Sequence, residues 1–123
     1  MERTFLQIGA ILGFLGVAFG AFGAHALKSR LSPEMLAVFE TGVRYQMYHA
    51  FAVLIVAAAI GRIGDARLLV MAGWLFVAGV LLFSGSLYTL ALTGVGILGA
   101  ITPIGCVLFL IGWGCLAVFA IGR

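Results

Sequence analysis

The residues able to do chemistry in this 123-residue chain are concentrated in one polar stretch, residues 20–49, and in a few polar positions farther along. A histidine beside a carboxylate can relay protons, so a small-molecule, ion or proton site is one hypothesis. A structural clamp, in which polar groups pair inside a membrane, is the other. The candidate polar cluster comprises His25, Glu40, Arg44, Tyr45, Gln46, Tyr48, His49, Ser84, Ser86, Tyr88 and Thr102.

Two charged residues of this cluster have the spacing of an ion pair. Glu40 and Arg44 are four residues apart, which places their side chains next to each other on one helix face. A charge at a bilayer boundary requires a partner whether or not it has a function. We therefore favour the clamp and predict a Glu40–Arg44 ion pair.

Enzymatic chemistry has little support in the sequence. It contains no zinc-protease motif, no Gly-x-Ser-x-Gly and no phosphate-binding loop. Ser84 or Ser86 with His49 as base would make a nucleophilic pair only if the fold brought them together. Cys106 and Cys115 are nine residues apart, about 13 Å along a helix and on opposite sides of it. We expect no catalytic residues, no metal site and no cofactor.

The composition places the chain in a membrane. Hydrophobic residues make up 64% of it and charged residues only 9%, whereas soluble domains are about a quarter charged. The seven lysines and arginines lie at the ends of apolar segments, where they would meet lipid phosphates. This distribution is not the basic stripe of a nucleic-acid-binding domain, so no nucleic-acid partner is expected.

Apolar runs and helix signals predict an all-α membrane protein with one transmembrane domain. Ser32, Pro33 and Glu34 form a helix start, so an amphipathic interfacial helix is predicted between the first two spans. Pro103 either begins the last helix or kinks it. A signal peptide is the alternative for the first run, but that run is too long and its first residues are nearly neutral. The predicted spans are residues 4–27, 45–61, 68–92 and 97–122, with the interfacial helix at 33–44.

Five glycines in the first span recur at intervals of four and three residues. They are Gly9, Gly13, Gly16, Gly20 and Gly23, here called the glycine stripe. Small residues on one helix face let another backbone approach closely, which is how membrane helices pack without a hydrophobic driving force. The stripe therefore predicts close packing against a neighbouring helix or another subunit.

Four spans would place both termini on the same side of the membrane. Arg3, Arg62, Arg67 and Arg123 would lie on that side and three cations on the other, which favours cytoplasmic termini by a margin of one. The same count of reversals brings the polar positions of all four spans to the opposite end of the bundle.

Four ordered motifs resemble a known family. GAFGAHALK, FETGVRYQMYHA, FSGSLYTLALTG and GAITPIG are similar to those of the YgdD/YwdK-like family of small bacterial membrane proteins, which has mitochondrial relatives in animals. The resemblance covers nearly the whole chain. It implies a multi-pass protein of the cell inner membrane with four helices and no established activity.

The polar positions and the resemblance together lead to one functional expectation and one alternative. We expect a non-enzymatic accessory or structural component, embedded in the lipid bilayer as a homo-oligomer or part of a larger membrane complex. The alternative is a self-associating transporter or channel for a small molecule, ion or proton, with its polar site at one membrane face.

Overall fold

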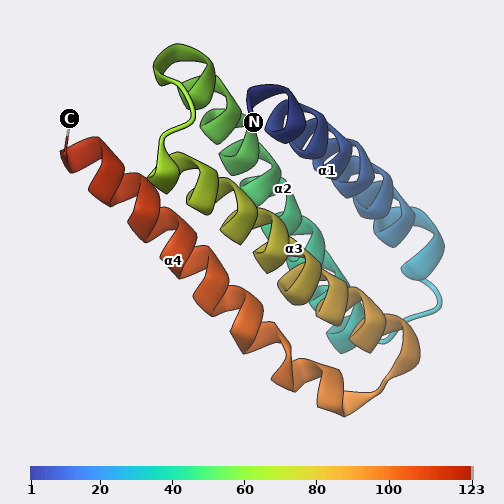
Figure 1. Cartoon of the computed structure of the whole chain (residues 1–123). Helices are drawn as coiled ribbons and strands as arrows, with labels where there is room; N and C mark the ends of the chain where they lie inside the picture. The colour runs from blue at the N-terminus through green and yellow to red at the C-terminus, as the bar shows by residue number, and fades with distance from the viewer. Residues whose placement is uncertain (123) are drawn as a thin grey trace.

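The computed structural model describes residues 1–122, and Arg123, counted above among the cations, lies outside the described residues. Each helix packs against the next one along the chain, and α1 and α4 lie on opposite sides of the central pair α2 and α3 (Figure 1). The helices are α1 Glu2–Phe22, continued by a π-helical segment Gly23–Leu27, α2 Pro33–Ile63, α3 Arg67–Thr93, and α4 Thr102–Ile121, preceded by a 3-10 segment Gly96–Ala100.

The helix boundaries follow local chemistry that is visible in the sequence. The hydroxyl of Ser32 accepts a hydrogen bond from the backbone N–H of Met35 at 3.2 Å, and Pro33 begins α2 as predicted. Gly64 and Gly94 end α2 and α3 with φ of 98° and 73°, a backbone conformation that favours glycine. Pro103 lies in the first turn of α4, so it begins that helix and does not kink it.

The interfacial helix expected at residues 33–44 is not a separate element. Those residues form the first part of α2, which continues without interruption for 31 residues. A helix of that length is about 46 Å long, well over the ~30 Å of a bilayer's hydrocarbon core. The polar first turns of α2 therefore extend beyond the hydrocarbon region as a continuation of the span, because no residue there breaks the helix.

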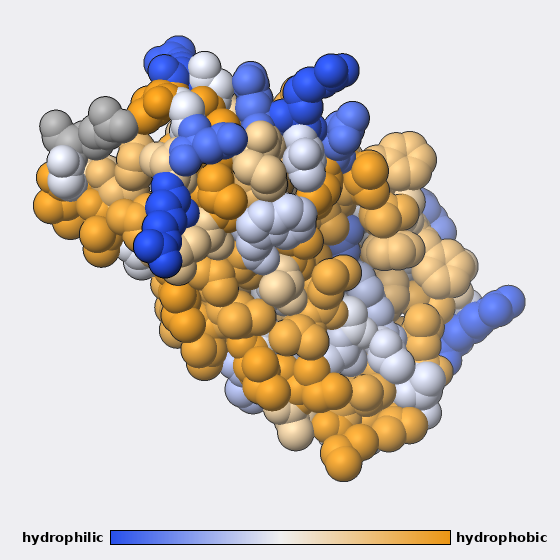
Figure 2. All heavy atoms as spheres, in the orientation of Figure 1, coloured by the Kyte–Doolittle hydropathy of each residue, from blue (hydrophilic) through white to orange (hydrophobic). Residues whose placement is uncertain are grey.

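Four helical segments are long and apolar enough to cross a membrane, namely Glu2–Leu27, Pro33–Ile63, Arg67–Thr93 and Gly96–Ile121. Their outer surfaces carry large apolar side chains such as Phe14 and Leu110, which are 76% and 66% exposed. Figure 2 shows an apolar body with the most hydrophilic residues toward its two ends. An apolar surface between two hydrophilic ends matches the hydrocarbon core of a bilayer, whereas its exposure to water would be unfavourable.

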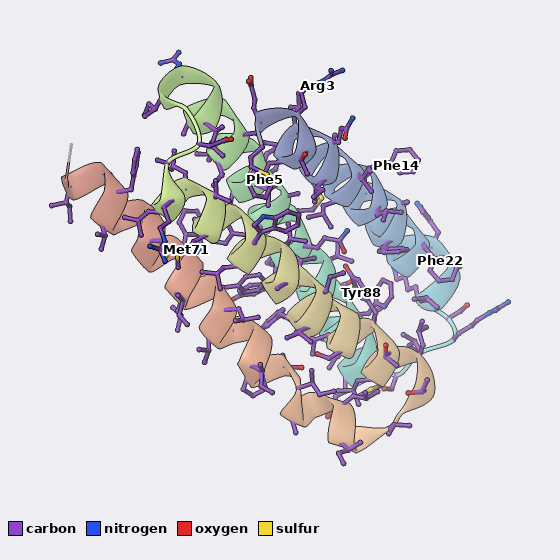
Figure 3. The ribbon with its side chains drawn as sticks, in the orientation of Figure 1. Arg3, Phe5, Phe14, Phe22, Met71 and Tyr88 are labelled. Atoms are coloured by element: carbon purple, nitrogen blue, oxygen red, sulfur yellow. The ribbon has the colours of Figure 1, made fainter. Side chains whose placement is uncertain are left out.

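The core lies along the central helix pair. Val53 and Val56 of α2 and Leu69 and Phe76 of α3 are almost completely buried. Phe5 of α1 reaches the same core, whereas Phe14 points away from the bundle (Figure 3). The aromatic rings fit because glycines face them: a side chain at Gly73 would overlap Phe5, and one at Gly112 would overlap Phe76.

Most of the glycine stripe faces α2. A Cβ atom at Gly9 would lie 2.7 Å from Leu54, and one at Gly16 would overlap Met47. Gly20 and Gly23 likewise face Val43 and Phe39 at 3.3 and 3.0 Å. The partner of the stripe is therefore the neighbouring helix of the same chain.

Gly13 is the exception in the stripe. No atom lies within 4 Å of a Cβ built at this position, so the expectation that Gly13 packs closely is wrong. At about 100° per residue Gly13 lies at one edge of the stripe, about 60° around the helix from Gly16, so it is turned away from α2 although its neighbours in the stripe on both sides touch that helix.

These two glycines make a matched pair for testing the packing of α1. We expect Gly16→Leu to destabilise the protein by about 1 to 3 kcal/mol, because the new side chain must displace Met47. Gly13→Leu should change stability by no more than about 0.5 kcal/mol. Denaturant titration of each purified variant in mixed micelles measures both values, and equal losses would contradict the assigned packing.

Candidate functional site

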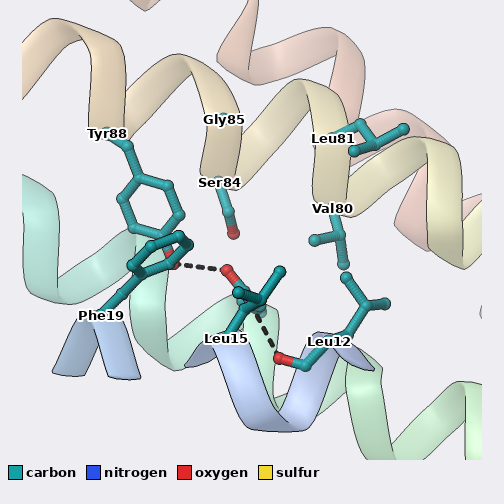
Figure 4. Close-up of a pocket in the computed structure, with 9 residues that line it drawn as sticks. Leu12, Leu15, Phe19, Val80, Leu81, Ser84, Gly85 and Tyr88 are labelled. Carbon is teal, nitrogen blue, oxygen red and sulfur yellow. Dashed lines mark hydrogen bonds between the residues drawn. The ribbon is translucent and has the colours of Figure 1, made fainter. Parts of the chain in front are cut away.

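Gln46 is the centre of the polar cluster that the fold assembles. Its side chain is only 3% exposed. Its Nε2 donates to the backbone oxygen of Leu12 at 2.8 Å, and the hydroxyl of Tyr88 donates to its Oε1 at 2.7 Å. Figure 4 shows both bonds, which link α1, α2 and α3 through one amide.

The Leu12 oxygen lies on α1 one turn before Gly16, a buried position that faces α2. A backbone oxygen has two lone pairs, so it can accept a second hydrogen bond besides that of its own helix. Gln46 Nε2 lies 3.6 Å from the position of a Cβ at Gly16, an ordinary van der Waals distance, so the residue that requires a glycine there is Met47. The bond from Gln46 to Leu12 thus lies beside the close packing of Gly16 on Met47, at the same contact between α1 and α2.

A second bond joins α2 to α3 one turn away. Ser84 is buried, and its hydroxyl donates to the backbone oxygen of Gly42 at 2.6 Å. A Cβ at Gly42 would lie 2.7 Å from the ring of Tyr88, so a larger residue would separate the two helices.

A third bond joins α3 to α4. The Ser86 hydroxyl donates to the oxygen of Phe83 in its own helix at 2.9 Å. Its oxygen lies 2.6 Å from the hydroxyl of Thr102, which must then be the donor.

His49 joins α2 to α4. Trp113 Nε1 lies 3.1 Å from His49 Nε2, and since an indole nitrogen can only donate, that imidazole nitrogen is the acceptor. Nδ1 therefore carries the proton and donates to the oxygen of Tyr45 at 2.7 Å. A ring that accepts at Nε2 and donates at Nδ1 is neutral, and it stacks on Phe109 with ring centroids 3.6 Å apart.

The structure brings together most of the predicted cluster but not its charged members. Gln46, Ser84, Ser86, Tyr88, His49 and Thr102 make the bonds above, and Tyr45 packs its ring against Phe83 at 4.6 Å. Tyr48 is exposed and touches Tyr45 edge-on. His25, Glu40 and Arg44 are exposed and take no part in this network.

The predicted Glu40–Arg44 ion pair does not form. Within residues 1–122 the only ion pair joins the N-terminal ammonium of Met1 to Asp65 at 3.5 Å. Glu40 and Arg44 lie on the part of α2 that extends beyond the hydrocarbon, where solvent already stabilises each charge. An exposed pair gains little there and would restrict two long side chains.

Neither Ser84 nor Ser86 is hydrogen-bonded to His49 in the described residues, so no serine nucleophile is paired with a histidine base. Both ring nitrogens of His49 are engaged by Trp113 and Tyr45, while Ser84 and Ser86 bond to other groups. None of these hydroxyls is oriented by a base.

Sequence reasoning missed Trp113, Phe109 and the two backbone oxygens. Trp113 carried a usable signal, because an indole N–H inside an apolar span needs an acceptor. The oxygens of Leu12 and Gly42 carried none, since any backbone oxygen beside a glycine would serve equally well.

A small crevice lies beside the Gln46 bonds, between α1 and α3. Its volume is about 170 Å³. Most of its wall is apolar, and Gln46, Ser84 and Tyr88 supply its only polar side chains (Figure 4). No group of three or more metal-ligating side chains occurs among the described residues.

The fold and the cluster define a class: a small membrane protein whose four helices are joined by buried hydrogen bonds. The family described as "Protein of unknown function (DUF423)" matches residues 19–106, and the chain belongs to it. The UPF0382 membrane protein YwdK of Bacillus subtilis is 45% identical, with 97% of each chain covered. A UPF0382 membrane protein of Haemophilus influenzae is 47% identical over 95% of this chain and 93% of its own. No solved structure matches.

Proposed function

We propose that this protein is a non-enzymatic accessory or structural component of the cell inner membrane. One observation carries the proposal: among the described residues, no buried side-chain nitrogen or oxygen lacks a hydrogen-bond partner. A binding or catalytic site in a membrane keeps polar groups available for its ligand, whereas here they bond to neighbouring helices. The function would then reside on the outer surfaces of the bundle.

The distribution of polar residues supports the same proposal. The buried polar side chains of residues 1–122 are Gln46, His49, Ser84 and Ser86. Beyond His49, toward the end of the bundle with the N-terminus, the buried side chains of α2 and α3 are all apolar. A translocated ion would have no polar groups to replace its water along that half of the path.

A small transporter or channel is the second candidate, and the crevice beside Gln46 favours it. The crevice has three polar side chains in its wall, namely Gln46, Ser84 and Tyr88. A path across the membrane would require further polar groups from a second copy of the chain.

Flux measurements separate the two candidates. We expect liposomes containing the purified protein to leak protons, Na⁺ and K⁺ no faster than protein-free liposomes. A faster flux that Gln46→Leu abolishes would establish the transporter and reject the accessory role. Gln46→Leu is informative only where circular dichroism shows the variant to be folded, and Ser84→Ala tests the same crevice with a smaller change.

The accessory role also makes a positive prediction. A photo-crosslinking residue in place of Phe14 on α1 or Leu110 on α4 faces outward from the bundle. In native membranes, at least one of the two positions should yield a discrete protein adduct. Liposomes that contain only this protein provide the control: an adduct retained there would identify self-association.

We further propose that both termini are cytoplasmic, supported by the cation count. The ion pair of Met1 with Asp65 places the N-terminus at the same end of the bundle as Arg62 and Arg67, which that count assigns to one side. In a chain with Cys106 and Cys115 replaced by alanine, a membrane-impermeant thiol reagent added outside whole cells should label Ser29→Cys. Asp65→Cys should react only after the membrane is opened. The opposite pattern would invert the orientation.

A further inference from the structure

A hollow on the outer surface lies between α3 and α4, away from the polar cluster. Its volume is about 460 Å³. Figure 3 shows Met71 where these two helices run side by side. Met71 and Trp74 remain 43% and 45% exposed, so the groove is open to lipid. It is lined by Val70, Met71, Trp74, Leu75 and Ala78 of α3 and by Ile111 of α4.

The lining of α3 forms one helical stripe, and Arg67 stands at its end. The five lining positions follow Arg67 at intervals of 3, 4, 7, 8 and 11 residues, which is the periodicity of one helix face. Arg67 is exposed and begins α3. An arginine thus stands on the same helix face one turn before the apolar groove, and the first turn of a helix also favours an anion.

The groove has the depth of one lipid leaflet. From Arg67 to Ala78 the helix rises by about 16 Å, roughly half of the ~30 Å hydrocarbon core. An acyl chain in the groove would therefore end near the bilayer centre when its head group lies beside Arg67.

We propose that this groove binds one acyl chain of an anionic phospholipid whose phosphate contacts Arg67. The charge at this end supports an anionic head group. Asp65, the nearest acidic residue along the chain, is paired with the N-terminal ammonium, and no ion pair of Arg67 occurs among the described residues. Arg62, in the last turn of α2, adds a second positive charge at the same end of the bundle.

A second copy of the chain is a poorer occupant of the groove. All six lining side chains are apolar, so a symmetric dimer across it would place two copies of Arg67 at one interface with no acidic residue of the groove as partner. A lipid phosphate neutralises the guanidinium and forms bidentate hydrogen bonds with it.

Tryptophan fluorescence offers a local test, because Trp74 lines the groove and Trp113 is the chain's other tryptophan. The Trp113→Phe variant would be reconstituted in phosphatidylcholine vesicles containing increasing fractions of brominated phosphatidylglycerol or brominated phosphatidylcholine. We expect half-maximal quenching of Trp74 at about five-fold lower mole fraction of the anionic lipid, the preference typical of one arginine at a membrane surface.

Variants at the outer end of the groove attribute that preference to Arg67. Arg67→Gln should abolish it and Arg67→Lys should retain it. Arg62→Gln is the matched control: it removes an arginine at the same membrane face but outside the α3 stripe, so the preference should persist. The Trp74→Phe variant, which reports on Trp113, should show no preference between the two lipids.

Three results would overturn the proposal: equal quenching of Trp74 by both lipids, a preference that survives Arg67→Gln, or protection of Trp74 from both lipids in a dimeric protein. A second measurement covers a failure of Trp113→Phe to fold. Native mass spectrometry of the unsubstituted chain, released from bilayers with equal amounts of both lipids, should retain about five-fold more phosphatidylglycerol than its Arg67→Gln variant. Equal retention would reject the site.

Discussion

Gln46→Leu is expected to destabilise the folded bundle by about 2 to 3 kcal/mol. The substitution removes two interhelical hydrogen bonds, each worth about 0.6 to 1.7 kcal/mol in membrane proteins. It also leaves the Tyr88 hydroxyl without its acceptor in a partly buried position, which adds a desolvation cost. Reversible unfolding in bicelles, followed by tryptophan fluorescence, measures the loss.

Tyr88→Phe provides the control for this prediction. It removes the hydroxyl but keeps the ring, which packs against Phe19 and Phe39. We expect a loss of about 1 kcal/mol, because Gln46 keeps its bond to Leu12. The double variant should be less destabilised than the sum of the two single variants, since the unpaired hydroxyl is then gone. Strict additivity would show that the two side chains do not interact.

Gly105→Ala is expected to have an effect of similar size, although it adds a single carbon. A Cβ at Gly105 would lie 2.5 Å from the backbone nitrogen of Phe83 and 2.9 Å from its Cα. A flexible side chain could move aside, but the α3 backbone cannot, so α4 must shift as a whole. We expect a loss of about 2 to 3 kcal/mol, at the upper end of overpacking costs.

Gly114→Ala is the matched control on the same helix. No atom lies within 4 Å of a Cβ built at Gly114, so the same added carbon meets open space. Its stability should equal that of the parent protein or exceed it slightly, because alanine restricts the unfolded chain more than glycine. The shift of α4 should also lengthen the Ser86–Thr102 bond in Gly105→Ala alone. Equal unfolding curves for the two variants would contradict the assigned α3–α4 contact.

The buried hydrogen bonds and the glycine contacts form one arrangement in this protein. Gly16 makes room for Met47, the neighbour of Gln46 in α2, and Gly42 lies against the ring of Tyr88, whose hydroxyl donates to the Gln46 amide. In lipid, the close packing of helices at their glycines replaces the hydrophobic effect that joins helices in water. This is why we assign the polar cluster to stability and look for function on the outer faces.

The sequence by itself determined the class of the protein and the first residue of α2, but it divided α2 into two helices that the structure shows as one. Apolar runs long enough to span a bilayer require helices, since lipid cannot satisfy backbone polar groups. Ser32, Pro33, Gly64 and Gly94 act through their own backbone geometry, so their effects were readable locally. The choice of Gln46, Ser84, Tyr88 and Thr102 as a cluster also followed from counting reversals of the chain.

The partners within that cluster were decided only by the tertiary structure. Whether Gly13 or Gly16 touches α2 depends on how α1 is rotated about its own axis against α2, which no local pattern encodes. Gln46 and Ser84 bond to backbone oxygens of Leu12 and Gly42, and every residue carries such an oxygen. The prediction of a Glu40–Arg44 ion pair was wrong because spacing alone only permits such a pair. Both side chains are exposed beyond the hydrocarbon, where water stabilises each charge without a partner.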